Sequence, residues 1–130
     1  MVLIDSSPWI DLLSGHPTVE AQRLDAWLRN GRPVATTGIV LQEVLQGART
    51  ERDLNLLRAR LGRLPFLHAD KETHVDAARL YRKARERGWA IPAADALIAA
   101  TALAHGVALL TADRRHFRAL AHVSKLRLAA

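Results

Sequence analysis

Short runs of apolar residues alternate along the chain with longer segments in which apolar residues recur every three or four positions. The short runs predict buried strands, and the recurrences predict amphipathic helices. We expect strands at 2–4, 34–36, 66–67, 107–111 and 123–128. We expect helices at 8–13, 19–29, 38–48, 51–61, 71–87, 96–105 and 114–120. Strands that alternate with helices predict an α/β fold, a three-layer α/β/α sandwich around a short-stranded, mainly parallel sheet.

The apolar spacing also predicts which side of each helix faces the core. The expected inward residues include Trp9, Ile10 and Leu13 in the first helix and Val75, Ala78 and Tyr81 in the helix at 71–87. Glu43 lies three residues after Val40 and four after Ile39, so it is predicted to share their apolar face. A carboxylate that faces inward is unusual and indicates a specific role.

Length and composition narrow the class of protein. The 130 residues suit a single domain, 1–130, that buries its own core. The chain has no cysteine, which excludes disulfide bonds and thiolate metal ligands. The apolar residues 2–4 are followed directly by Asp5, which is not the pattern of a signal peptide. No run of apolar residues approaches the roughly 18 that a membrane helix needs. We therefore expect a soluble, cytoplasmic protein without a membrane partner.

Basic residues outnumber acidic ones and give a formal net charge of +6. They are concentrated in the segments 49–63 and 79–87. Such a balance favours a polyanionic partner, nucleic acid above all. A solvated basic surface that aids solubility remains the alternative.

The segment from Ile91 to Asp113 carries two acids separated by a helix and a strand. About 10 helical residues rise roughly 15 Å, and about five strand residues return roughly 16 Å. Gly106 is positioned to end the helix between them. Asp95 and Asp113 are therefore predicted to lie at the same edge of the sheet.

Four acids are expected to meet at this edge, where the carboxyl ends of parallel strands lie and where such sheets bind ligands. They are Asp5, Glu43, Asp95 and Asp113. Four ionised carboxylates repel one another, and a divalent cation relieves that repulsion. An all-oxygen site suits Mg²⁺ or Mn²⁺. Zinc is disfavoured because there is no cysteine and, on this interpretation, no histidine paired with an acid at helical spacing.

Each residue also has a purely structural interpretation. Asp95 alone would most simply cap its helix, Asp5 would cap the helix that follows it, and Asp113 would begin a turn. Glu43 would be a surface residue if the helix phase were different. His116 is expected to be a surface or capping histidine, since no second histidine lies at ligand spacing. Taken together, the four acids at one edge favour the metal site.

Three stretches resemble the motifs of PIN-domain ribonucleases, specifically the VapC-type toxins of toxin–antitoxin pairs. VLIDSSPWIDLL is similar to the first motif, TGIVLQEVLQGAR to the second, and DALIAATALAHGVALLTADRRHF to the third and fourth. The resemblance implies that Asp5, Glu43, Asp95 and Asp113 are the catalytic and Mg²⁺-binding acids. It also implies that Thr111 and Ser6 are supporting polar residues. Family members often have a further Asp where this chain has His116, so the choice between one metal ion and two stays open.

The resemblance further implies Mg²⁺-dependent endoribonuclease activity on structured RNA, a homodimer, and inhibition by a small cognate antitoxin. Two other hypotheses are weighed against it. A non-catalytic RNA- or protein-binding module on the same fold would bind RNA regardless of chelators. A phosphoryl-transfer protein would use Asp5 as nucleophile. Two observations argue against this phosphoryl-transfer hypothesis. Such phosphatases commonly carry a second acid two residues after the first, where this chain has Ser7, and no lysine lies near Asp113.

Overall fold

A four-stranded parallel sheet forms the centre of the protein. The computed structural model describes residues 1–129. Its strands are β1 (Val2–Ile4), β2 (Val34–Thr37), β3 (Phe66–Leu67) and β4 (Ala108–Leu110), in the order β3-β2-β1-β4. Leu3 pairs with Ala35 on one side and with Leu109 on the other, both in parallel register. The predicted α/β class and parallel sheet are confirmed.

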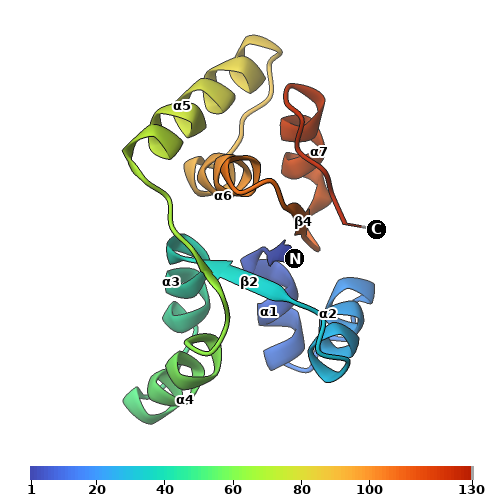
Figure 1. Cartoon of the computed structure of the whole chain (residues 1–130), viewed down its shortest axis with the longest axis vertical. Helices are drawn as coiled ribbons and strands as arrows, with labels where there is room; N and C mark the ends of the chain where they lie inside the picture. The colour runs from blue at the N-terminus through green and yellow to red at the C-terminus, as the bar shows by residue number, and fades with distance from the viewer. Residues whose placement is uncertain (130) are drawn as a thin grey trace.

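Helices cover both faces of this sheet. They are α1 (Ser6–Leu13), α2 (Val19–Arg29), α3 (Gly38–Gln46), α4 (Glu51–Leu61), α5 (Lys71–Glu86), α6 (Ala93–Ala104) and α7 (Arg114–His122). In Figure 1, α5, α6 and α7 lie on one side of β2, and α1, α2 and α4 lie on the other. No helix in residues 1–129 is long and apolar enough to cross a membrane.

The order of the strands reverses at β1. The chain first moves outward from β1 through β2 to β3, and it then returns through α5 and α6 to place β4 on the other side of β1. In doubly wound sheets, the carboxyl ends of the strands at such a reversal form the crevice where ligands bind. The residues that follow β1 and β4 are therefore the ones to examine for function.

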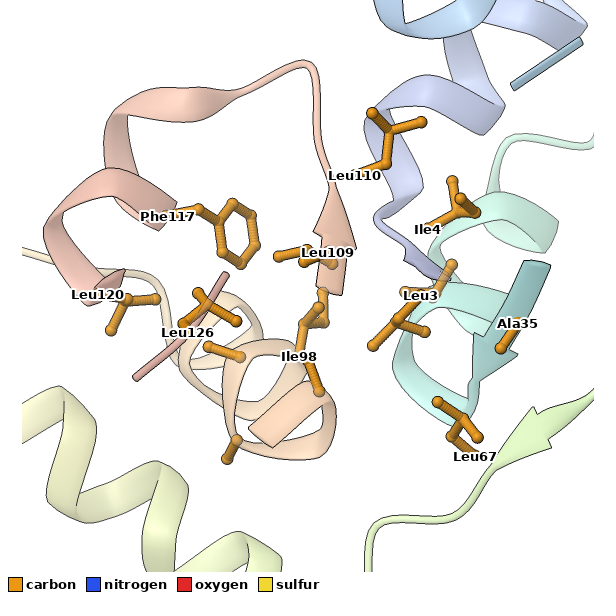
Figure 2. Packing of buried hydrophobic residues seen from close by; sticks show 14 of the residues in the cluster. Leu3, Ile4, Ala35, Leu67, Ile98, Leu109, Leu110, Phe117, Leu120 and Leu126 are labelled. Carbon is orange, nitrogen blue, oxygen red and sulfur yellow. The ribbon is translucent and has the colours of Figure 1, made fainter. Parts of the chain in front are cut away.

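The core joins β1 and β4 to the helices α6 and α7. Figure 2 shows the ring of Phe117 from α7 lying beside Leu109 of β4, with Ile98 of α6 close to Leu3 of β1. All four side chains are fully buried. Burying a side chain of this size contributes about 1.5–3 kcal/mol. Phe117 therefore fixes the position of α7, and with it the side chain of the preceding residue.

Several predictions about inward faces were wrong. Ile10 and Leu13 are 46% and 38% exposed, although Trp9 beside them is buried as predicted. On α5, the exposed residues include Val75 and Tyr81. The side of α5 that is buried carries Thr73, Ala77, Leu80 and Ala84. The small residues on this side allow α5 to pack closely on the alanine-rich α6. The close contact between the two helices therefore decides which side of α5 is buried, and the larger apolar residues Val75 and Tyr81 stay exposed.

The expected last strand at 123–128 forms only in part. After α7 ends, a single parallel bridge joins Leu128 to Leu109. The amide N–H of Ala129 donates to the carbonyl of Leu109 at 2.8 Å, and the guanidinium of Arg114 donates to the carbonyl of Ala129 at 3.0 Å. This segment therefore ties the edge of β4 to the start of α7.

Candidate metal centre

Asp5 lies immediately after β1 and is only 4% exposed. Its Oδ2 atom accepts hydrogen bonds from the Thr111 hydroxyl at 2.9 Å and from the Ser7 hydroxyl at 3.0 Å. Each hydroxyl in turn accepts a backbone N–H from the loop after β4, from Ala112 for Ser7 and from Asp113 for Thr111. This loop therefore fixes the orientation of the Asp5 carboxylate.

Burial is the main influence on the acidity of Asp5. It raises the pKa of the carboxyl above its ordinary value, and the nearby charge of Asp113 raises it further. The hydrogen bonds from Thr111, from the backbone of Ser6 and from Ser7 oppose this effect. The hydroxyl pair thus helps to keep a buried carboxylate ionised.

Glu43 projects from α3 toward Asp5. Its Oε1 atom is buried and has no hydrogen-bond partner. Burial raises its pKa, the charge of Asp5 raises it further, and a hydrogen bond to the side chain of Ser6 lowers it. A buried carboxylate oxygen without a partner is uncommon in proteins and is available to bind an ion or a water molecule. The prediction that Glu43 faces inward is confirmed.

Asp95 lies in the first turn of α6 and does not cap it. The helix begins at Ala93, the capping position is Pro92, and no side chain caps the helix. The Oδ2 atom of Asp95 instead lies 3.1 Å from Nδ1 of His116. Burial first, and then the charge of Asp5, raise the pKa of Asp95 to about 6, although His116 opposes the shift. The interpretation of Asp95 as a helix cap is therefore wrong.

Asp113 and His116 complete the cluster at the start of α7. The Oδ2 atom of Asp113 lies 3.6 Å from Nδ1 of His116. One ligand atom each from Asp95, Asp113 and His116 lie within 4.8 Å of one another. His116 is 24% exposed and lies against both acids, which makes it a candidate ligand that the sequence did not predict. The argument against a histidine ligand also fails, because Asp113 and His116 stand three residues apart at the start of a helix.

The structure thus brings all four predicted acids to one place, with Thr111 beside them. The side chain of Ser6 bonds Glu43, and its backbone bonds Asp5. The sequence reasoning missed Ser7, which bonds Asp5 from two residues further along α1. This donor set, carboxylate oxygens with one imidazole nitrogen, fits a divalent cation. The unpartnered oxygen of Glu43 supports that fit.

A parallel sheet with helices on both faces and an acidic cluster where its strand order reverses is the arrangement of a doubly wound, metal-dependent phosphoryl-transfer domain such as the PIN nucleases. The family model for the PIN domain matches residues 2–123. The chain is 34% identical over 117 residues to ribonuclease VapC19 of Mycobacterium tuberculosis, which covers 90% of this chain and 92% of the relative. The chain belongs to the PIN-domain family, and within it to the VapC-type ribonuclease toxins.

Solved structures agree with this fold. A toxin–antitoxin complex from Klebsiella pneumoniae matches with a TM-score of 0.73 and 27% identity over 90% of both chains. VapBC2 from Rickettsia felis, bound to a promoter DNA fragment, matches with a TM-score of 0.78 and 22% identity, covering 99% of this chain and 98% of that one. The second likeness concerns the fold alone.

Proposed function

We propose that this VapC-type nuclease is an endoribonuclease that hydrolyses phosphodiester bonds in RNA with Mg²⁺ or Mn²⁺, and that it acts in the cytoplasm as the toxin of a type II toxin–antitoxin pair. The observation that carries the proposal is the convergence of the carboxylates around Asp5. Its charge raises the pKa of both Glu43 and Asp95, so Asp5 lies close enough to repel each of these two carboxylates. A group of ionised carboxylates that repel one another is stable at neutral pH when a cation is bound between them.

The residues that would hold the cation are Asp5, Glu43, Asp95 and Asp113. When bound, a divalent cation lowers the pKa of a water molecule and neutralises the charge that develops on the phosphodiester. Thr111 and Ser7 keep the Asp5 carboxylate ionised and oriented.

Basic side chains beside the cluster support RNA as the substrate. Arg115 and Arg118 flank His116 on α7, and both are exposed. Together with His116 and Trp89, they line a cavity next to α7. Arginine side chains bind phosphate groups, and an aromatic ring offers a surface for a base. An RNA strand in this cavity would contact His116, whose ring lies against Asp95 and Asp113.

The test is cleavage of RNA by the purified chain with Mg²⁺, with Mn²⁺ and with EDTA. We expect cleavage that EDTA abolishes and that Asp5→Asn and Asp95→Asn each reduce by at least about a hundredfold, because both remove charge from the site. Asp76→Asn is the matched control, since Asp76 pairs with Arg79 on the exposed side of α5. Unchanged cleavage in both site variants would rule the proposal out. Salt-sensitive binding without cleavage, indifferent to EDTA, would instead support a binding module.

An apolar groove between α1, α3 and α4 supports an antitoxin as partner. Ile10, Leu13 and Leu56 are 46%, 38% and 57% exposed there, and Arg49 and Arg60 line the same groove. This pattern suits an amphipathic helix that carries acidic residues beside its apolar face. We propose that the antitoxin binds here through such a segment.

A second apolar face, formed by α3, α5 and α6, supports a homodimer. Its surface carries Ile39, Ala78, Tyr81 and Leu97, and Tyr81 is 37% exposed. Val75 on the same helix is equally exposed. Apolar side chains gathered on one face are typical of surfaces that bind another protein. We propose that two copies of the chain pair through this face.

A further inference from the structure

We propose that His116 is itself a ligand of the cation, so that the centre is a mixed nitrogen–oxygen site with a preference for Mn²⁺ over Mg²⁺. The proposal deepens the proposed function and rests on it, because it concerns the cation that the carboxylates would hold. It assigns a metal-binding role to the one residue at which this chain departs from the acidic pattern that its motifs resemble.

The spacing of the donor atoms carries the inference. Neighbouring ligands of an octahedral ion with bonds of about 2.1 Å lie about 3.0 Å apart, and opposite ligands lie about 4.2 Å apart. Nδ1 of His116 lies 3.1 Å from Oδ2 of Asp95 and 3.6 Å from Oδ2 of Asp113. One ligand atom from each of the three residues can be chosen so that all lie within 4.8 Å of one another. These spacings are close to those of three ligands that share one ion.

The fold holds the imidazole in this position. His116 lies one turn after Asp113 on α7, and the adjacent Phe117 is fully buried against β4. The histidine side chain is 24% exposed, and the nitrogen that faces the two carboxylates is Nδ1. Because Phe117 fixes the helix, Nδ1 already lies beside the two carboxylates before an ion binds. Binding would require Nδ1 to be unprotonated, so the ion would take the place of the proton between Nδ1 and Asp95. A preorganised ligand loses little conformational entropy on binding.

The identity of the donor sets the preference among metals. Mg²⁺ strongly favours oxygen ligands, whereas imidazole suits first-row transition metals such as Fe and Zn. Mn²⁺ belongs to the same row and also suits carboxylates, so we expect it to accept this mixed set of donors better than Mg²⁺ does. A neutral imidazole in place of a carboxylate also removes one negative charge, which weakens Mg²⁺ binding more than it weakens the binding of an ion with affinity for nitrogen. We expect the ratio of Mn²⁺ to Mg²⁺ affinity to be at least about tenfold higher than in His116→Asp.

Electron paramagnetic resonance of Mn²⁺ tests this proposal without any measurement of activity. Titration of the free Mn²⁺ signal gives the Mn²⁺ affinity, and displacement by Mg²⁺ gives the Mg²⁺ affinity. Pulsed measurements on the bound ion detect the ¹⁴N nucleus of a directly bound imidazole. The variants are His116→Asp, which restores an acid, and His116→Gln, which removes the ring. His122→Gln is the control, because His122 is exposed on the same helix and contacts Trp89 instead of the acids.

We expect a ¹⁴N signal in the wild type and in His122→Gln, and none in the two His116 variants. His116→Asp should bind Mg²⁺ more tightly and lose the preference for Mn²⁺. Bound Mn²⁺ without a ¹⁴N signal in the wild type would overturn the proposal and would reduce His116 to a hydrogen-bond partner of Asp95. If RNA cleavage still required a cation in that case, the proposed function would stand. If no Mn²⁺ bound and RNA cleavage continued in EDTA, both the histidine ligand and the proposed metal-dependent function would be wrong.

Discussion

Replacing Asp95 by Asn should make the metal-free protein more stable while it abolishes RNA cleavage. Asn has nearly the same shape as Asp and keeps an oxygen for His116, but it carries no charge. The change therefore removes one member of a group of repelling carboxylates and leaves the packing intact. Replacing a functional residue is expected to stabilise a protein when that residue is repelled by like charges in its site.

The magnitude follows from the acidity of Asp95. Its pKa rises from 3.8 to about 6 in the folded protein. Since one pKa unit corresponds to about 1.4 kcal/mol, the full shift would cost the ionised form about 3 kcal/mol. Solvent screens a carboxylate that is not fully buried, which reduces the cost to about 1.5 kcal/mol. Losing a negative charge from the first turn of α6 offsets about 0.5 kcal/mol of this gain. The net stabilisation is about 1 kcal/mol, or about 3–4 °C in Tm.

The difference in stability between Asp95→Asn and the wild type depends on pH. Below the unfolded pKa of 3.8, Asp95 is protonated in both states and resembles Asn. As the pH rises through about 6, the wild type loses stability that the variant keeps. The difference in Tm should therefore be near zero at about pH 4 and complete at about pH 7.5. Saturating Mn²⁺ should reverse the order, because only the wild type gains the full free energy of binding.

The assay is thermal unfolding followed by circular dichroism in EDTA, repeated across this pH range for the wild type, Asp95→Asn and the control Asp76→Asn. Removing Asp76 breaks an exposed ion pair with Arg79, so it should change Tm little and without this pH dependence. The reasoning would be refuted if Asp95→Asn were no more stable than the wild type at pH 7.5. A gain that stayed constant with pH would refute it equally.

Three further predictions concern the other parts of the molecule. Thr111→Val removes a hydrogen bond to the buried carboxylate of Asp5, so it should lower kcat for RNA cleavage about tenfold. It should also lower the free energy of unfolding, measured in urea, by about 1–2 kcal/mol. The control Thr101→Val, within α6, should leave kcat unchanged. Tyr81→Glu should give a monomer by light scattering where the wild type is a dimer, and two species of equal mass would contradict this. Leu56→Glu should weaken antitoxin binding at least about tenfold in calorimetry with cleavage unchanged, because it places a charge in an apolar groove.

The sequence predicted the sheet and the four acids because both follow from simple periodicity. Short apolar runs such as Val2–Ile4 favour strands because they are too short for a helix, and acids that follow parallel strands lie at one edge. Glu43 reaches the same edge from within α3, and Asp95 reaches it from the first turn of α6. The phase of α5 was mispredicted because its buried side is made largely of alanine, which carries a weak apolar signal.

The role of Ser7 depends on which way its side chain points across a loop, and no spacing along the chain encodes that direction. Asp113 and His116 do have helical spacing, but the helix was expected to begin only at Arg114, so the pair was not recognised.

The hydrogen bond between Thr111 and Asp5 joins residues that are 106 positions apart in the sequence. It connects the first strand of the chain to the loop after the last one, and β1 has β4 as one of its two neighbours in the sheet. A growing polypeptide that stops before β4 lacks Thr111, Asp113 and one side of the central strand. The acidic cluster can therefore assemble only after the segment from β1 through Asp113 has left the ribosome. The order of synthesis thus keeps Asp5 without its hydroxyl partner Thr111 until β4 has been made.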